Sequence, residues 1–162
     1  ALPGTPGLMH RIGGIEKEDG SGNISYTPEN HGHMVATRAA KVAGIANDIP
    51  LAEVTGDVAD AELLVLGWGS TWGSIVTAVD RERAKGRKVA HCHITHLNPF
   101  PSNLGEVLRR YSKIIVPEMN TGQLSRLVRA EFLVDAKAVS KVKGVPFTAA
   151  EIQTAIIEAL GV

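Results

Sequence analysis

The feature that most constrains the fold is an alternation of short apolar segments with helix-like segments from residue 49 onward. Residues 61–66 form an apolar run, broken by Glu62 and closed by Gly67, which is typical of a strand covered on both faces. Because helix-like segments separate the strands, the sequence predicts an α/β domain with a mostly parallel sheet and helices on both faces. We expect further strands at 51–55, 88–95, 113–117 and 134–141, and helices at 74–85, 104–111, 121–132 and from Thr148 in a capping box with Glu151.

The segment before residue 49 has a different character. Residues 1–26 are rich in Gly and Pro, so we expect an extended lead-in. Thr27 and Pro28 form a helix start, which predicts a connecting helix over 27–48 and leaves 49–162 as the α/β domain. The chain lacks an initiator Met and a secretory signal, so we expect a processed or truncated piece.

Charge and cysteine content exclude several classes of protein. The 162 residues carry 17 basic and 17 acidic side chains, so no excess charge is available for field-driven binding to nucleic acid or a membrane surface. The apolar runs are too short to span a membrane. A single cysteine, Cys92, excludes an internal disulfide framework and any four-cysteine metal or iron–sulfur site. This cysteine usage favours a cytoplasmic location.

A glycine-rich turn at 67–73 follows the apolar run. Gly67 and Gly69 fit a dinucleotide-binding turn, but Gly73 comes one position late. The turn is therefore interpreted either as a tight, closely packed strand-to-helix connection or as a phosphate cradle. Trp68 and Trp72 within it suggest a covered contact surface.

Polar groups follow the strand expected at 113–117. Glu118, Asn120 and Gln123 lie in a loop that enters a helix, at the sheet edge where α/β proteins place ligands and contacts. Helix capping and recognition both remain open as explanations of this loop.

Histidines occur in three places. On a strand, His91 and His93 share one face while Cys92 and His96 point the other way. A His-x-His pair can ligate a metal, but the sequence fixes no third ligand, so hydrogen-bonding imidazoles are the other interpretation. Cys92 is expected in the core. The basic pair His10-Arg11 could reach another subunit, and the histidines of His31-Gly32-His33 are expected to be solvated.

An ordered series of segments resembles the C-terminal part of the alpha chain of 2-oxoacid:ferredoxin oxidoreductases, most like the 2-oxoglutarate enzymes. The resemblance covers nearly the whole chain and implies a fold like the C-terminal domain of transketolase. The segments that carry it are Gly7–Lys17, Pro28–His31, Gly67–Thr71, Leu97–Pro101 and Pro117–Leu124.

The resemblance implies a reaction and a set of cofactors. The reaction is coenzyme A-dependent oxidative decarboxylation of 2-oxoglutarate to succinyl-coenzyme A, with electrons passed to ferredoxin. Thiamine diphosphate, Mg²⁺ and a [4Fe-4S] cluster are expected in the complete enzyme, with none bound by this chain, and no catalytic residue is carried over. The implied partners are the rest of the alpha chain, the beta subunit and ferredoxin, in a heterodimer or a dimer of heterodimers.

The role expected for this piece is architectural. Alternatives are an enzyme for pyruvate or another 2-oxoacid, a free-standing nucleotide- or coenzyme-binding module, and a pure interaction domain. His10 and Arg11 are expected at the approach to the catalytic centre. The expected contact surface is the carboxyl edge of the sheet, with Gly67, Trp68, Gly69, Trp72, Phe100, Glu118, Asn120 and Gln123.

Overall fold

A computed structural model describes residues 2–56 and 59–162, and the chain divides into two compact units. Unit 1 is Ala1–Asp48 and unit 2 is Ile49–Val162. Within the described residues, no helix is both long enough and apolar enough to cross a membrane.

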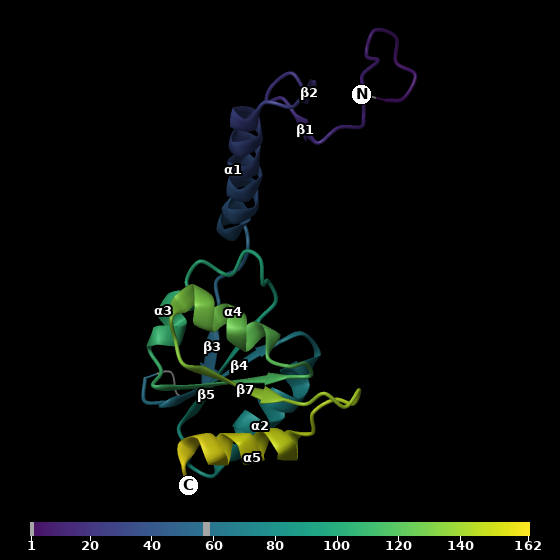
Figure 1. The fold of residues 1–162 in the computed structure, drawn as a ribbon. Helices are drawn as coiled ribbons and strands as arrows, with labels where there is room; N and C mark the ends of the chain where they lie inside the picture. The colour runs from purple at the N-terminus through teal and green to yellow at the C-terminus, as the bar shows by residue number, and fades with distance from the viewer. Residues whose placement is uncertain (1, 57–58) are drawn as a thin grey trace. The chain divides into compact units, whose positions relative to one another are not determined.

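Unit 2 is built on a five-stranded sheet in the order β3-β5-β4-β6-β7 (Figure 1). The strands β4, β5, β6 and β7 run parallel, and β3 pairs with β5 antiparallel at one edge. The sequence prediction of a mostly parallel sheet is therefore confirmed. The strands are β3 (Val54–Gly56), β4 (Leu63–Trp68), β5 (Val89–Ile94), β6 (Lys113–Glu118) and β7 (Ala136–Ser140).

Helices cover both faces of this sheet, as the alternating pattern predicts (Figure 1). The helices α2 (Trp72–Ala84) and α5 (Ala149–Leu160) lie on one face, and α3 (Leu104–Arg109) and α4 (Gln123–Phe132) lie on the other. Side chains of β4 alternate between the two cores. Leu64 and Leu66 pack under α3 and α4, whereas Leu63 and Val65 pack under α2 and α5.

The start of α5 agrees with the sequence prediction, whereas α2 and α4 start at other residues than predicted. The capping box of α5 is present, since Thr148 Oγ1 accepts from the Glu151 amide at 3.2 Å and Glu151 accepts from the Thr148 amide at 2.7 Å. In contrast, α4 begins at Gln123 rather than 121, because Gly122 adopts a φ of 88° that breaks the helical path. The helix α2 begins at Trp72, after a short 3₁₀ turn at Gly69–Thr71.

Unit 1 contains one helix and one hairpin. Helix α1 (Pro28–Gly44) begins after Thr27 as expected, and a 3₁₀ turn follows it at Ile45–Asn47. Strands β1 (Glu16–Lys17) and β2 (Ile24–Ser25) pair antiparallel within the segment expected to be an extended lead-in. Two-residue strands are too short to leave a periodic pattern, so this hairpin has no signal in the sequence.

Helix α4 ends in an unusual backbone conformation. Leu133 follows the helix with a φ of 55°, the left-handed region, and its amide donates to the Arg129 carbonyl at 3.1 Å. Its side chain is 89% exposed, so no core packing compensates for the conformation. Glycine would occupy this position without the steric clash that a Cβ introduces.

We expect Leu133→Gly to stabilise unit 2 by about 1 kcal/mol, because it removes the left-handed strain at little cost in packing. Urea unfolding followed by circular dichroism measures the change. Leu127→Gly, an exposed position inside the same helix, is the control and should destabilise by about 1 kcal/mol. Destabilisation by both variants would contradict the assignment of strain to Leu133.

Candidate functional site

The carboxyl ends of the central strands form the candidate site. The turn after β4 and the loop after β6 lie at this edge because the two strands are parallel neighbours. Together they enclose a cleft of about 200 Å³. The sequence-predicted residues Trp68, Gly69 and Asn120 line it, joined by Ser70, Thr71 and Met119.

Close packing explains the glycines of the turn. A Cβ on Gly67 would lie 2.6 Å from Ile75 Cδ1 and 2.7 Å from His93 Nδ1, so a side chain does not fit there. Gly69 has a φ of 58°, and its carbonyl accepts from His93 Nε2 at 3.2 Å. The Thr71 hydroxyl closes the turn by donating to the Trp68 carbonyl at 2.7 Å. The geometry favours the tight, packed connection over the phosphate cradle.

Two of the three predicted polar residues, Glu118 at the end of β6 and Asn120 after it, cap helix α4. Glu118 is 1% exposed, and its carboxylate accepts the Leu124 amide at 2.7 Å and the Ser125 amide at 3.0 Å. Asn120 accepts from the amides of Gly122 and Gln123, both at 2.8 Å. Glu118 therefore lies beneath the surface of unit 2 rather than on it, and Gln123 is the exposed member of the predicted set.

The aromatic and apolar side chains at this edge differ in how much of their surface is exposed to a partner. Trp72 is 56% exposed and Trp68 is half-buried. Phe100 is half-buried and packs on Phe132, with ring centroids 5.5 Å apart. Met119 is exposed and lines the cleft. The sequence does not indicate this role, because a single methionine in a polar loop forms no pattern that predicts a contact. The lining of the cleft is thus largely apolar.

His91 and His93 share a face of β5, as predicted, and their rings meet edge to face with centroids 5.7 Å apart. Burial, followed by the charge of His93, lowers the pKa of His91 to about 4, against a smaller opposing effect of Asp80. Within the described chain, His91 Nε2 and His93 Nδ1 are buried without a hydrogen-bond partner. Burial likewise raises the pKa of Cys92 to about 12, which makes it an inert core residue.

Two of the cofactors expected for the complete enzyme, the iron–sulfur cluster and the metal ion, find no set of ligands in the described part of this chain. An iron–sulfur cluster needs several thiolates, whereas Cys92 is the single cysteine and is buried in the core. Across residues 2–56 and 59–162, no group of three or more His, Cys, Asp or Glu side chains could hold a metal ion. The paired imidazoles of His91 and His93 therefore have no third ligand in the described chain.

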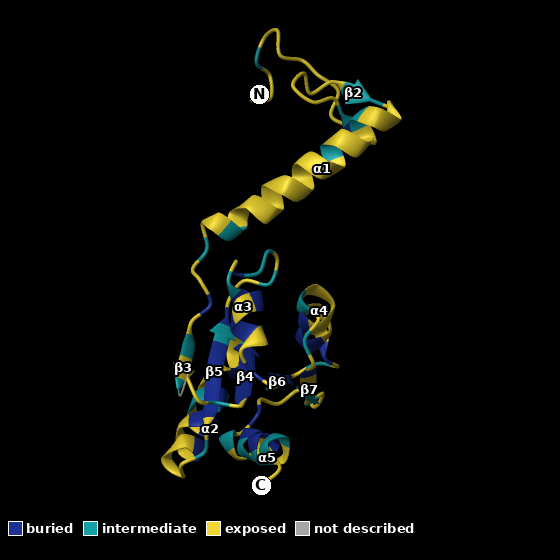
Figure 2. Cartoon of the chain, turned by 90° about the vertical axis from the view of Figure 1, so that its left-hand side faces the viewer, coloured by how far each residue is buried: buried dark blue, intermediate teal, exposed yellow. Residues whose placement is uncertain are grey.

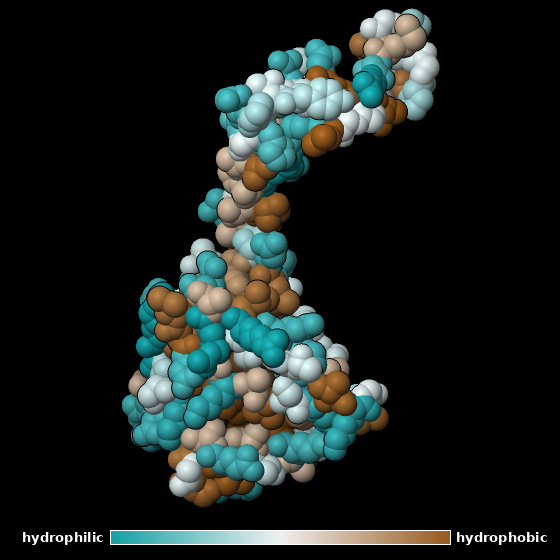
Figure 3. All heavy atoms as spheres, viewed as in Figure 1, coloured by the Kyte–Doolittle hydropathy of each residue, from teal (hydrophilic) through white to brown (hydrophobic). Residues whose placement is uncertain are grey.

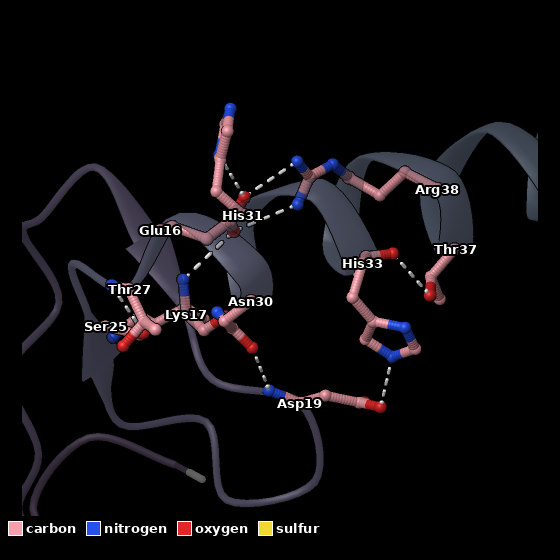
Figure 4. Close-up of polar contacts among 10 residues, drawn as sticks. All are labelled: Glu16, Lys17, Asp19, Ser25, Thr27, Asn30, His31, His33, Thr37 and Arg38. Carbon is pink, nitrogen blue, oxygen red and sulfur yellow. Dashed lines mark hydrogen bonds and ion pairs between the residues drawn. The ribbon is translucent and has the colours of Figure 1, made fainter.

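A second polar cluster holds the hairpin of unit 1 to helix α1 (Figure 4). Arg38 donates to both Glu16 oxygens at 3.0 and 2.9 Å, and His31 Nδ1 lies 3.1 Å from the same carboxylate. His33 pairs with Asp19 at 2.7 Å. His31 and His33 are solvated as expected, with side chains 57% and 56% exposed, and each also meets a carboxylate from the hairpin.

Hydrogen bonds stabilise the charged form of Glu16. The bond from Arg38, followed by that from the Lys17 amide, lowers the pKa of Glu16 to about 2. The cluster was not visible in the sequence because Glu16 and its partners are separated by 15 and 22 residues.

The predicted basic pair also lies in unit 1. His10 and Arg11 are exposed; His10 Nδ1 donates to the Leu8 carbonyl at 2.8 Å, and Lys17 Nζ donates to the Arg11 carbonyl at 2.5 Å. His10 lines an open hollow of about 600 Å³ with Lys17. Nothing in this segment forms a set of catalytic groups among the residues described.

The parallel sheet, its order and its covering helices define a transketolase-like α/β domain. A split-gene transketolase matches 67% of the chain and 41% of its own length, with a TM-score of 0.52 and 14% identity, which shows the fold alone. Residues 61–152 match the family described as pyruvate:ferredoxin oxidoreductase core domain II. The chain belongs to this family.

Curated relatives and a solved structure extend this assignment. The 2-oxoglutarate oxidoreductase subunit KorA of Mycobacterium tuberculosis is 56% identical over 160 residues, which are 99% of this chain and 24% of that protein. A 2-oxoglutarate:ferredoxin oxidoreductase from Magnetococcus marinus, solved with 2-oxoglutarate, coenzyme A and succinyl-CoA, has a TM-score of 0.88 and 33% identity, over 99% of this chain and 28% of that one. This chain therefore spans about a quarter of the length of either protein.

We expect acid to destabilise unit 2 through His91. The unfolded histidine titrates near pH 6.5 and the native one near 4, so stability present above pH 6.5 is lost as the pH falls toward 4, by up to about 3 kcal/mol. His91→Leu should remove most of that loss, as measured by denaturant unfolding at pH 7.5 and 5. His96→Leu, at an exposed histidine, should retain the wild-type pH dependence. An unchanged pH dependence in His91→Leu would refute this assignment.

Glu118→Ala should destabilise unit 2 by about 2 to 3 kcal/mol, because two buried amides of α4 lose a charged acceptor. Gln123→Ala, at an exposed position of the same region, should change the free energy of unfolding by less than about 0.5 kcal/mol. Thermal and urea unfolding measure both. Equal, small effects would show that the carboxylate does not hold the helix.

Proposed function

We propose that the chain is the C-terminal portion of the alpha subunit of a 2-oxoglutarate:ferredoxin oxidoreductase. The complete enzyme would convert 2-oxoglutarate and coenzyme A to succinyl-coenzyme A and carbon dioxide, with the electrons passed to ferredoxin. The observation that carries the proposal is the 56% identity to the Mycobacterium tuberculosis KorA subunit along 99% of this chain. The likeness in fold to the Magnetococcus marinus enzyme supports it independently.

The part proposed for this chain is to build and hold the assembly. Two polar residues at the carboxyl edge, Glu118 and Asn120, are committed to the domain's own backbone, since both cap α4. What this edge offers a partner is apolar surface from Trp72 and Met119. We propose that it packs against the rest of the alpha chain, and that His10 and Arg11 of unit 1 lie at the approach to the catalytic centre.

The proposed partners are the rest of the alpha chain, a beta subunit and ferredoxin, in a heterodimer or a dimer of heterodimers. Mg²⁺ and a [4Fe-4S] cluster would be held outside this chain, since its described residues offer no set of ligands for them, and we propose the same for thiamine diphosphate. We also propose a cytoplasmic location, for which the support is the cysteine usage.

A free-standing nucleotide- or coenzyme-binding module is less well supported. The residues lining the cleft of 200 Å³ carry no formal charge, so none supplies a cation for a phosphate group. The close packing around Gly67 removes the other argument for a phosphate cradle.

A chimera tests the proposed function. This chain replaces the matching segment of the Mycobacterium tuberculosis KorA subunit, and the chimera is produced with the beta subunit of that enzyme. We expect ferredoxin reduction that depends on both 2-oxoglutarate and coenzyme A, because the replaced segment is 56% identical. The 162-residue chain alone should be inactive. An assembled chimera that turns over no 2-oxoacid, or a free chain that does so unaided, would overturn the proposal.

A further inference from the structure

Unit 1 has almost no interior of its own. Within residues 2–48, all of which the structure describes, the single buried residue is Glu16, a carboxylate. Its partners Arg38 and His31 connect the hairpin to helix α1 by polar contacts (Figure 4). Burial of apolar surface is the dominant favourable contribution to folding, and here it is nearly absent. The unit is held together mainly by polar contacts.

Large apolar side chains are nevertheless plentiful on this unit, and they face solvent. Helix α1 runs for 17 residues without one buried position (Figure 2). Val35 and Val42, 47% and 37% exposed, lie seven residues apart, which places them on the same side of the helix. Figure 3 shows apolar surface on unit 1 beside the polar atoms. Other exposed apolar residues are Leu2, Leu8, Met9, Ile12, Ile15, Tyr26 and Ile45.

The comparisons separate unit 1 from the family core. The family match begins at residue 61, so the shared core domain does not account for unit 1. The match to the Mycobacterium tuberculosis KorA subunit covers 160 residues of this chain and therefore includes nearly all of unit 1. Those 160 residues are 24% of that protein, which leaves about three quarters of its length to form a surface against which unit 1 can be buried.

We propose that the side of α1 marked by Val35 and Val42 docks on the part of the alpha subunit that the Mycobacterium tuberculosis relative has outside the matched segment. The inference rests on the proposed function. Residues 1–48 carry four basic and five acidic side chains, so the complementary surface is apolar rather than strongly charged. A domain of the same subunit supplies such a surface in a fixed ratio to this chain.

Hydrogen–deuterium exchange on the chimera described above tests this docking. We expect the amides of residues 28–44 to exchange at least about tenfold more slowly in the assembled chimera than in the free chain. Val42→Glu should abolish that protection, and Val42→Ala should reduce it in part. Ala40→Glu, an exposed position on the opposite side of α1, is the matched control and should keep the protection. Protection of β4 and β6 reports that unit 2 remains folded in every variant.

Equal exchange of residues 28–44 in chimera and free chain would overturn the docking. So would protection that survives Val42→Glu, or sedimentation equilibrium showing a dimer of the free chain that Val42→Glu dissociates, since a second copy would then be the occupant. Turnover of 2-oxoglutarate is read separately. Protection of residues 28–44 that depends on Val42, without turnover of 2-oxoglutarate, would reject the proposed function and keep the docking. Turnover without this protection would reject the docking and keep the proposed function.

Discussion

Burial of strand β4 on both faces is the constraint on which unit 2 depends. Leu63, Leu64, Val65 and Leu66 are fully buried, two toward each helical layer. Burial contributes roughly 1.5 to 3 kcal/mol for each large apolar side chain, so this strand stabilises both of the cores that it joins. Strands β5 and β6 flank β4 on either side, which places β4 at the centre of the sheet.

The strand and helix order of unit 2 could be predicted from the sequence because each strand and α-helix has at least five residues and carries its own pattern, except the short edge strand β3. The capping box at Thr148 could also be predicted, since its two members lie three residues apart in the sequence. The hairpin of unit 1 was not, because strands of two residues leave no period. The place of Glu118 was ambiguous for another reason: a carboxylate after a strand can bind a ligand or cap a helix, and the fold decides which.

The candidate site shows how packing can produce a pattern that resembles a binding motif. Gly67 is required because Ile75 and His93 fill the space where a side chain would stand. Glycine at such a turn is common to nucleotide-binding loops and to closely packed ones, and only the surroundings separate them. Glu118 and Asn120 serve the backbone of α4, and the cleft beside them is lined mostly by apolar surface.

The topology also has a bearing on how such chains can diversify. Residues before 49 lead into β3, the antiparallel strand at the sheet margin, and not into one of the four parallel strands. Gene fusion or recombination ahead of residue 49 would exchange the segment before the α/β domain. The order of the four parallel strands would stay unchanged. Because the chain enters the sheet at an edge strand, the junction near residue 49 is a position at which evolution can join this domain to a different segment.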